Sequence, residues 1–446
     1  MSWQKTLKAY RDPPVLRILF LGFSSGLPFL LTLATLHVWL LEAGLSKTTI
    51  GIFAAVTLPY SFKFLWAPVV DSWRLPFFCS LFGQRKGWMI FSQIALMISL
   101  IILGRSRPEI SPFITAAAAS NVAFWSATQD IVIEAFRIEA LNHDQAGLGA
   151  GASSTGYRLG MWISGAGALY LASAFSWSTV YLVMAFCMII GLLTTLLSDE
   201  PGRTSLYKSN FQHSKIHPLP PPSTTAFSVI LHRLKSLFGP SLKRLFKTET
   251  ILVTLLFIFL FKVGDTVLNT MTMPFLLETG FSKIEIAHVA KSFGIAAAML
   301  GSLVAGVFLV KRPLIYNLIL CCSLQIVASL MFMIQARLGH HLPWLFFSMG
   351  VENFACGMAT ASYLVFVSSR CTRPFTGTHF ALLCSFGSFC RIMVSSVAGW
   401  AADQLIWQDF YFLTALLCLP ALLLLGTVPG AFQNPLQKED SDQIAA

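Results

Sequence analysis

Twelve long apolar stretches dominate this chain of 446 residues and leave few folds open to it. They lie at about 17–39, 48–70, 88–104, 110–133, 147–173, 178–197, 249–277, 284–310, 313–335, 342–368, 374–399 and 408–428. A helix needs about 20 mostly apolar residues to cross a hydrocarbon core of ~30 Å, and these stretches are long enough. Strands of a membrane barrel would be shorter and would alternate apolar with polar residues. The sequence therefore predicts an all-α membrane protein with twelve transmembrane helices.

Composition and charge support the same class. The chain is 55% hydrophobic and 11% charged, too apolar to cover a soluble surface with polar groups. Its net charge of +11 follows from loops rich in Lys and Arg, most of which lie on one side of the predicted spans. Such loops stay in the cytoplasm, so both termini are expected there. Because no basic run outside the spans is interleaved with aromatic residues, nucleic-acid binding is excluded.

The nine cysteines lie in apolar spans or in predicted cytoplasmic loops, so no disulfide framework is expected. No CxxC motif occurs and the His residues lack metal-ligand spacing, so neither a metal site nor a cofactor is expected. The basic segment Met1–Arg17 precedes a long apolar span with no A-x-A site behind it. We interpret this start as the first transmembrane helix and not as a cleaved signal peptide.

The two halves of the chain resemble each other. The segment from Leu40 to Ile50 (LLEAGLSKTTI) recurs from Leu276 to Ile286 (LLETGFSKIEI), with Glu, Gly, Ser and Lys all matching. Asn121 and Arg158 have counterparts at nearly the same distance, in Asn353 and Arg391. An even number of helices per copy keeps the two copies parallel, which is the arrangement of major-facilitator transporters. We predict two parallel six-helix repeats.

The predicted domains are a first bundle at 1–198, a cytoplasmic linker at 199–248, a second bundle at 249–430 and a cytoplasmic tail at 431–446. The first part of the linker contains the run PLPPP (218–222) and is typical of a disordered connection. Its second part, 223–238, has apolar residues at helical spacing and basic residues beside them. This pattern predicts a helix lying on the inner membrane surface. A helix that binds a regulatory partner is the alternative.

Ionisable residues inside the spans mark functional positions, because each costs about 2.5–3.5 kcal/mol on insertion scales unless it meets a partner or water. On helix four, Asp130, Glu134 and Arg137 share one face at i, i+4 and i+7. They predict either an ion-pair lock between helices four and five or a direct role in binding substrate or protons. Arg158 lies in GYRLG, where small residues permit a close helix contact. It is expected to meet either an anionic ligand or a carboxylate, and Asp130 or Glu134 is the near candidate.

The second half adds its own charges. Lys262 and Asp265 are spaced to form an ion pair within one helix, or to act on the substrate or proton directly. Glu352 and Arg391 lie in later spans, and Asp265 is a possible partner for Arg391. Lys63 and Lys291 are weaker candidates, because each could extend to the membrane surface.

Several motifs resemble those of the AmpG-type muropeptide permeases, a branch of the major facilitator superfamily. They are GFSSGLP (22–28), FKFLWAPVVD (62–71), GQRKGW (83–88), ATQDIVIEAFR (127–137), GYRLGM (156–161), FKVGD (261–265), KSFG (291–294), ENFACGMATASYLVF (352–366) and THFALLCSF (378–386). In helix four the family usually has Asp where Glu134 stands and Trp where Phe136 stands. The central loop is also unusually long here. The resemblance nevertheless extends through both halves.

The resemblance implies a monomeric importer in the bacterial inner membrane, not an enzyme. It would carry anhydromuropeptides, which are glycopeptide fragments of the cell wall, from periplasm to cytoplasm together with protons. The expected substrate-binding residues are Asn121, Gln129, Tyr157, Arg158, Lys262, Asn353 and Arg391. The candidates for proton coupling are Asp130, Glu134, Asp265 and Glu352. A facilitator for another anionic solute, such as a siderophore or an acyl-coenzyme A, is the main alternative, ahead of a channel or sensor.

One further expectation concerns a gate. Asp71 closes the second span and GQRKGW opens the third, which resembles the conserved loop of facilitators. We expect Asp71 and the pair Arg85 and Lys86 to stabilise the cytoplasmic side when the transporter faces outward.

Overall fold

The computed structural model describes residues 3–201, 239, 245, 251–286, 288–289 and 293–427, and all regular structure within these residues is helical. Nine helices of the described residues are long and apolar enough to cross a membrane. Three further long helical segments, α9, α10–α11 and α19, bring the described spans to twelve. The predicted surface helix at 223–238, Lys291 and the predicted tail at 431–446 lie outside the described residues.

The first half contains six spans, several of them built from consecutive helices. In chain order they are α2 (Pro13–Leu31) with α3 (Ala34–Glu42); α4 (Lys47–Ile52), η2 (Phe53–Thr57), α5 (Leu58–Phe62), η3 (Lys63–Leu65) and α6 (Ala67–Ser72); α8 (Gln84–Gly104); α9 (Pro112–Ala140); α10 (Ala146–Trp162), η5 (Ile163–Gly167) and α11 (Ala168–Ala172); and α12 (Trp177–Cys187) with α13 (Ile189–Leu196). Short helices lie outside these spans: α1 (Trp3–Lys8), η1 (Ala9–Arg11), α7 (Phe78–Phe82) and η4 (His143–Gln145).

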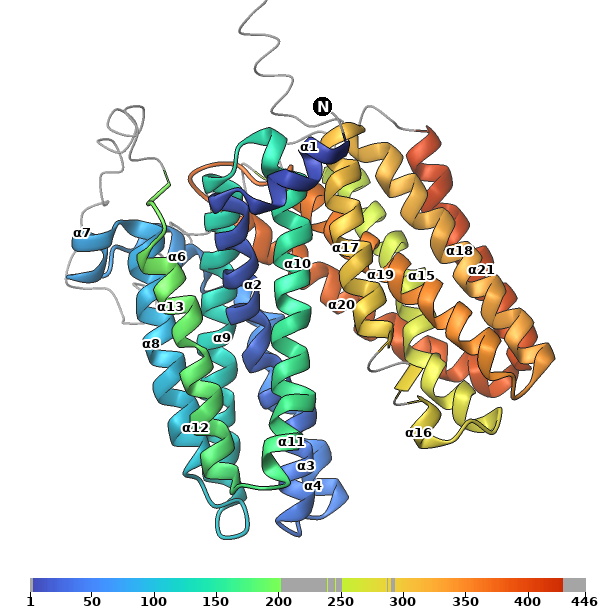
Figure 1. Ribbon diagram of the computed structural model, residues 1–446, viewed down its shortest axis with the longest axis horizontal. Helices are drawn as coiled ribbons and strands as arrows, with labels where there is room; N and C mark the ends of the chain where they lie inside the picture. Colours follow the sequence, from blue (N-terminus) through green and yellow to red (C-terminus); the bar gives the residue numbers. More distant parts are fainter. Residues whose placement is uncertain are drawn as a thin grey trace, which may run out of the picture.

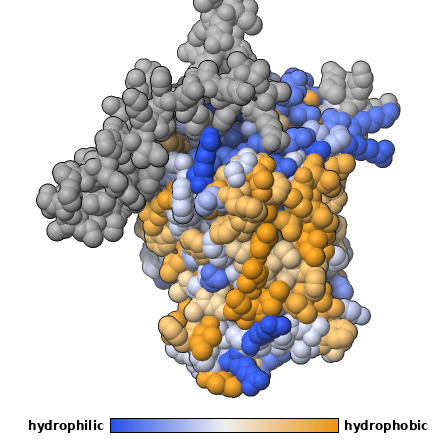
Figure 2. Space-filling view, turned by 90° about the vertical axis from the view of Figure 1, so that its left-hand side faces the viewer, coloured by the Kyte–Doolittle hydropathy of each residue, from blue (hydrophilic) through white to orange (hydrophobic). Residues whose placement is uncertain are grey.

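The second half also contains six spans, most of which are single continuous helices. Its helices are α15 (Ile251–Glu278), α16 (Lys283–Ile286), α17 (Gly294–Lys311), α18 (Leu314–Leu338), α19 (Leu342–Ser368), α20 (Thr376–Gln404) and α21 (Trp407–Thr427). Figure 1 shows the two halves side by side, with α1 and the end of α21 at one end of the molecule. We call this the terminal end and the other the opposite end. Figure 2 shows an apolar band with hydrophilic residues gathered above and below it, as a membrane-spanning protein requires.

The second span was predicted as one continuous helix over 48–70, but the structure divides it into five helical segments. Two of the restarts coincide with proline, because Pro59 opens α5 and Pro68 opens α6. Proline has no N–H to donate within a helix and is favoured in its first turn. The hydropathy of the span was therefore a good guide to its length but not to its continuity.

The close contact expected around Arg158 is confirmed. A methyl group added at Gly156 would lie 2.0 Å from the Leu19 carbonyl oxygen, and one at Gly160 would lie 2.4 Å from that of Phe23. Helices α10 and α2 therefore touch backbone to backbone, which only small residues permit. This contact fixes the helix that carries Arg158 firmly to the first span.

The duplicated segment ends two helices in the same way. After α3, the N–H groups of Gly44 and Leu45 donate to carbonyls in the last turn at 3.0 and 3.1 Å; after α15, those of Gly280 and Phe281 do so at 3.1 Å each. Gly44 and Gly280 have φ values of +80° and +93°, a region that favours glycine. Both copies thus form the same C-terminal cap, and this explains why the glycine recurs.

The glutamate of the duplicated segment also has one role in both copies. Trp177 Nε1 donates to Glu42 Oε2 at 2.8 Å, and Trp407 Nε1 donates to Glu278 Oε2 at 2.8 Å. Each bond joins the first span of its half to the last. We call these two pairs the clasps. They hold each six-helix bundle together at the opposite end of the molecule.

The two halves meet mainly through α10 and α17. Ser154 and Ser302 share a hydrogen bond of 2.9 Å at this crossing, and both side chains are buried. A methyl group at Gly151 would lie 2.6 Å from the Ser302 carbonyl oxygen, so the helices approach closely. Within the described residues, the hydrogen bonds between the halves run from the terminal end to the level of Arg158, and none joins residues of the opposite end.

Tyr10 adds a further link at the same crossing. Its hydroxyl donates to the Leu303 carbonyl of α17 at 2.6 Å. The space that it fills exists only because Gly151 and Gly306 lack side chains: a methyl group would come within 2.7 Å of this hydroxyl at Gly151 and within 2.1 Å at Gly306. The segment that precedes the first span is thereby attached to the second half.

Candidate functional site

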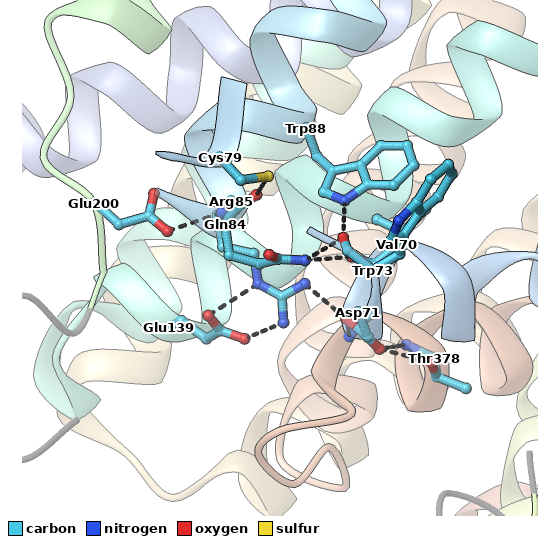
Figure 3. A network of polar contacts seen from close by, with 11 residues as sticks. Val70, Asp71, Trp73, Cys79, Gln84, Arg85, Trp88, Glu139, Glu200 and Thr378 are labelled. Atoms are coloured by element: carbon cyan, nitrogen blue, oxygen red, sulfur yellow. Dashed lines mark hydrogen bonds and ion pairs between the residues drawn. The ribbon is translucent and has the colours of Figure 1, made fainter. Parts of the chain in front are cut away.

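A buried polar network joins the two halves at the terminal end, around Asp71 (Figure 3). Asp71 lies in the last turn of α6, and its Oδ1 accepts a 2.6 Å bond from Arg85 Nη1. Its Oδ2 accepts from the Thr378 N–H at 2.7 Å and from the Thr378 hydroxyl at 2.6 Å, while the Gly377 N–H lies 3.3 Å from Oδ1. Helix α20 has no side-chain cap from its own preceding residue. Asp71 therefore caps α20 from the other half of the molecule.

Arg85 connects this cap to helix α9. Its guanidinium donates from Nε and Nη2 to the two carboxylate oxygens of Glu139, at 3.1 and 2.6 Å. Such a bidentate pair fixes both side chains more firmly than a single bond would. Arg373 adds another contact between the halves, because its Nη2 donates to the Glu139 carbonyl at 3.0 Å.

Glu200 follows the sixth span in the chain, and its side chain caps the first turn of α8. Its carboxylate accepts the backbone N–H groups of Arg85 and Lys86 at 2.8 and 2.9 Å. Burial raises the pKa of Glu200 above its ordinary value, while these two N–H groups and the charge of Arg85 lower it in part. Gln84 and Trp88 complete the network by donating to the Trp73 carbonyl at 2.9 and 2.8 Å.

The two basic residues of the expected gate have different partners. Arg85 contacts Asp71, whereas the Lys86 Nζ donates to the Leu196 carbonyl at 3.2 Å. Sequence reasoning missed Glu139, Glu200 and Thr378, because each lies far from Asp71 and Arg85 in the chain. A sequence signal did exist for Glu139, which is a further acidic residue two positions after Arg137, near the end of helix four.

The two carboxylates on α9, the predicted helix four, have different cations as partners. Asp130 accepts a 2.5 Å bond from the Ser25 hydroxyl and lies 3.8 Å from Lys63 Nζ. Glu134 accepts 2.9 and 2.7 Å bonds from Arg137 and one of 3.4 Å from Ser153 of α10. The ion pair of Glu134 with Arg137 therefore lies within α9, and the contact of Glu134 with α10 is the hydrogen bond from Ser153. The expectation that Asp130 or Glu134 pairs with Arg158 is wrong, because nearer cations occupy both carboxylates.

Arg137 also reaches the second half, where its Nη2 donates to the Ser368 hydroxyl at 2.8 Å. The Arg137 side chain is 2% exposed, and Ser368 is half-buried. This bond supplements the cap at Asp71 in holding the terminal end of the two bundles together.

Arg158 instead points across the boundary between the halves. Its Nη2 lies 3.4 Å from Thr360 Oγ1 and 3.6 Å from Cys356 Sγ, both on α19. Its Nε is buried without a hydrogen-bond partner, and among the described residues no carboxylate lies within ion-pair distance of it. A guanidinium in a span that is not paired with an acid is suited to an incoming anion.

In the second half, the ion pair that residue spacing predicted within one helix is present on α15. Lys262 Nζ lies 4.0 Å from Asp265 Oδ2 and 4.6 Å from the centre of the Tyr363 ring. Arg391 of α20 is exposed, and it forms no ion pair within the part of the chain that the structure describes. The expected pair of Arg391 with Asp265 is therefore wrong, since Lys262 occupies this carboxylate.

Glu352 and Asn353 lie together on α19. Glu352 is 4% exposed, and its Oε2 accepts a 2.7 Å bond from Asn353 Nδ2. The charged groups that act on this carboxylate are Arg158 and Asp265. It has no cation within ion-pair distance among the described residues.

Three other predicted residues have different surroundings. Tyr157 lies within electrostatic reach of Arg158, Arg391 and Asp130, so it belongs to the same region. Gln129 is fully buried, and both atoms of its amide group lack a hydrogen-bond partner in the described part of the chain. Asn121 donates to Ser99 of α8 at 2.7 Å, which places it in the contact between α8 and α9.

A group of charges from both halves thus gathers around Arg158. We call it the central charged cluster, and its members are Lys63, Asp130, Arg158, Lys262, Asp265, Glu352 and Arg391. Within the described residues no set of three His, Cys, Asp or Glu side chains gathers as a metal site would require. The arrangement offers cations for an anionic solute and carboxylates for protons, and Tyr157 lies beside them.

Comparison with known proteins agrees with this arrangement. The model of the Major Facilitator Superfamily matches residues 18–394. An anhydromuropeptide permease of Escherichia coli K12 is 33% identical over 94% of this chain and 80% of its own length. The chain belongs to the Major Facilitator Superfamily, in its AmpG-type branch. A transporter of Rickettsia conorii named AmpG 4 is 30% identical over 94% of this chain and 97% of its own length.

Solved structures of the superfamily share the fold. The proton:xylose symporter XylE superposes with a TM-score of 0.67 at 11% identity, over 95% of this chain and 96% of the other. FucP, a facilitator solved in an outward conformation, gives 0.63 at 12% identity over 93% and 98%. The predicted fold class and the assignment to a multi-pass membrane transporter, not an enzyme, are confirmed.

Proposed function

We propose that this AmpG-type permease imports anhydromuropeptides from periplasm to cytoplasm in symport with protons. The observation that carries the proposal is Arg158, a cation inside a span that faces the other half and lacks an acidic partner among the described residues. The permease of Escherichia coli that resembles this chain is named for the same class of solute. A glycopeptide of this class carries carboxylates, which a guanidinium can bind with two parallel hydrogen bonds.

The orientation of the protein in the membrane is inferred from its charge. Loops rich in Lys and Arg remain in the cytoplasm, and they lie at the terminal end. In the present conformation the hydrogen bonds between the bundles are at that end, with Asp71 capping α20. We therefore assign the terminal end to the cytoplasm and this conformation to the outward-facing state. Alternating access then requires the Asp71 network to separate.

Uptake of labelled anhydromuropeptide into proteoliposomes, with and without a proton gradient, tests the proposal. Arg158→Ala and Arg391→Ala should each abolish uptake while the protein still inserts and folds. Arg158→Lys should recover only part of the rate, since lysine cannot form the two-pronged contact with a carboxylate. Arg337→Ala is the matched control, because Arg337 is an exposed arginine at the end of α18.

The result that contradicts the proposal is equally specific. If Arg158→Ala imports the labelled compound at close to the unmodified rate, Arg158 has a structural role and the solute binds elsewhere. If the unmodified protein carries no anhydromuropeptide but does carry an anionic siderophore or acyl-coenzyme A, the substrate class is wrong and the transporter assignment stands.

A further inference from the structure

Most carboxylates of the spans have a cationic partner, but Glu352 does not among the described residues. Four of the buried or half-buried carboxylates each have a cation within 4.0 Å: Asp71 with Arg85, Asp130 with Lys63, Glu134 with Arg137 and Asp265 with Lys262. Glu352 is more deeply buried than most of them and has only the amide of Asn353 as a hydrogen-bond donor. An ionised carboxylate in such a place is costly, so the neutral acid is favoured.

Arg158 is the complementary case, a cation without an acid. Its two contacts, Cys356 and Thr360, follow Glu352 on α19 at intervals of four residues. Residues four apart lie one above another on a helix face, about one turn of 5.4 Å from each other. Glu352 therefore stands one turn from the point where Arg158 touches α19, close enough for a change of side-chain rotamer to bring the two together.

Other titratable groups around Glu352 do not supply a second cation. Asp265 of α15 carries the same charge, and Cys356 and Tyr411 are the neighbouring thiol and phenol. Arg158 is the cation that acts on Glu352 within the described part of the chain. Lys291, which precedes α17 in the sequence, lies outside the described residues, so Lys291→Met is one of the variants to be measured.

We propose that Glu352 carries the transported proton and that its ionised form competes with the substrate carboxylate for Arg158. The proposal rests on the proposed function. While Glu352 is protonated, Arg158 is free to bind the anionic end of the solute. When Glu352 loses its proton to cytoplasmic water, the new carboxylate pairs with Arg158 and displaces the solute. One cation thus serves two anions in turn, and this competition couples the proton to the substrate.

The first test measures binding of anhydromuropeptide to the purified protein as pH rises. The unmodified protein should lose at least about tenfold in affinity, the change that corresponds to ~1.4 kcal/mol, as Glu352 ionises. Glu352→Gln should keep its affinity across the same range, and it should exchange solute but not accumulate it against a gradient. Glu134→Gln is the matched control, because Glu134 already has Arg137 beside it, and its binding should remain dependent on pH.

A second test needs no substrate and separates this inference from the proposed function. Infrared spectroscopy detects the carbonyl band of a protonated carboxylic acid. The band should be present near neutral pH in the unmodified protein and in Glu134→Gln, and Glu352→Gln should lack it. The Arg158→Ala variant should retain the band to higher pH, since the ionised form loses its cation.

The outcomes are distinct. A Glu352→Gln protein that still accumulates solute on a proton gradient would overturn the role of Glu352, even if import itself is established. A band that persists to higher pH in Lys291→Met, but not in Arg158→Ala, would mean that Lys291 is the partner of Glu352, and the competition for Arg158 would be refuted. Loss of pH dependence and of the band in Glu352→Gln together would support the proposal.

Discussion

Replacing Asp71 by Asn should open the terminal end of the transporter. Asp71 accepts two bonds from Thr378 of the other half, at 2.7 and 2.6 Å. A hydrogen bond to an ionised group is about twice as strong as a neutral one, for which the net contribution is about 1 kcal/mol. Losing the charge should therefore cost about 1 kcal/mol per bond, or ~2 kcal/mol in the closed state alone. The equilibrium should shift about 30-fold toward the state with an open terminal end.

Thiol labelling measures this shift, in a background from which the nine native cysteines have been removed. A cysteine at Ser302 is fully buried between α10 and α17 in the present conformation and should react much faster in Asp71→Asn. A cysteine at Asn269, which is exposed and contacts Asp265 of the central charged cluster, should react more slowly, because the opposite end closes. Thr378→Val removes one of the two bonds and should give a smaller shift in the same direction.

The matched control is Glu278→Gln, since its bond to Trp407 lies within one bundle and should not distinguish the two states. Equal labelling rates for Asp71→Asn and the unmodified protein at both positions would refute the reasoning. So would a shift of the same size in Glu278→Gln, because the effect would then be a general loss of stability.

Two further predictions concern stability and the membrane. Trp177→Phe and Trp407→Phe each remove one clasp and should each lower the free energy of unfolding by about 1 kcal/mol, and the two effects should add because the sites lie in separate bundles. Denaturation of the single and double variants measures these effects, and a double effect far from the sum would contradict the prediction. A peptide of residues 223–238 should become helical on anionic vesicles and lose that helicity as salt rises; circular dichroism measures it, and a peptide that stays disordered there is not a surface helix.

Local pairs in the candidate site could be predicted from the sequence, and distant ones could not. Lys262 with Asp265 and Glu134 with Arg137 are three residues apart, so helical geometry alone brings them together. The choice between Lys63 and Arg158 as the partner of Asp130 depends on how α5, η3 and α10 are placed around α9. No spacing rule contains that information, and the expected pairs of both Arg158 and Arg391 were wrong for this reason.

The fold was more predictable than the site. Span lengths are fixed by the membrane, and a duplicated segment indicates a duplicated bundle whatever the contacts inside it. The reason for each repeated residue was visible only in the structure, where Glu42 and Glu278 accept a tryptophan N–H and Gly44 and Gly280 have positive φ. The cap that Asp71 provides for α20 was likewise hidden, because it joins residues about 307 positions apart.

The hydroxyl of Tyr10 has a consequence for the working cycle of this protein. It occupies the space between two glycines, one on each of the helices that must part when the terminal end opens. If the proposed alternating access parts these helices at this level, the bond to Leu303 breaks and forms again once in every turnover. A bulky fusion placed ahead of Trp3 would travel with the segment that contains Tyr10. We therefore expect the rate of transport to depend on what is attached there, although the attachment lies outside the central charged cluster.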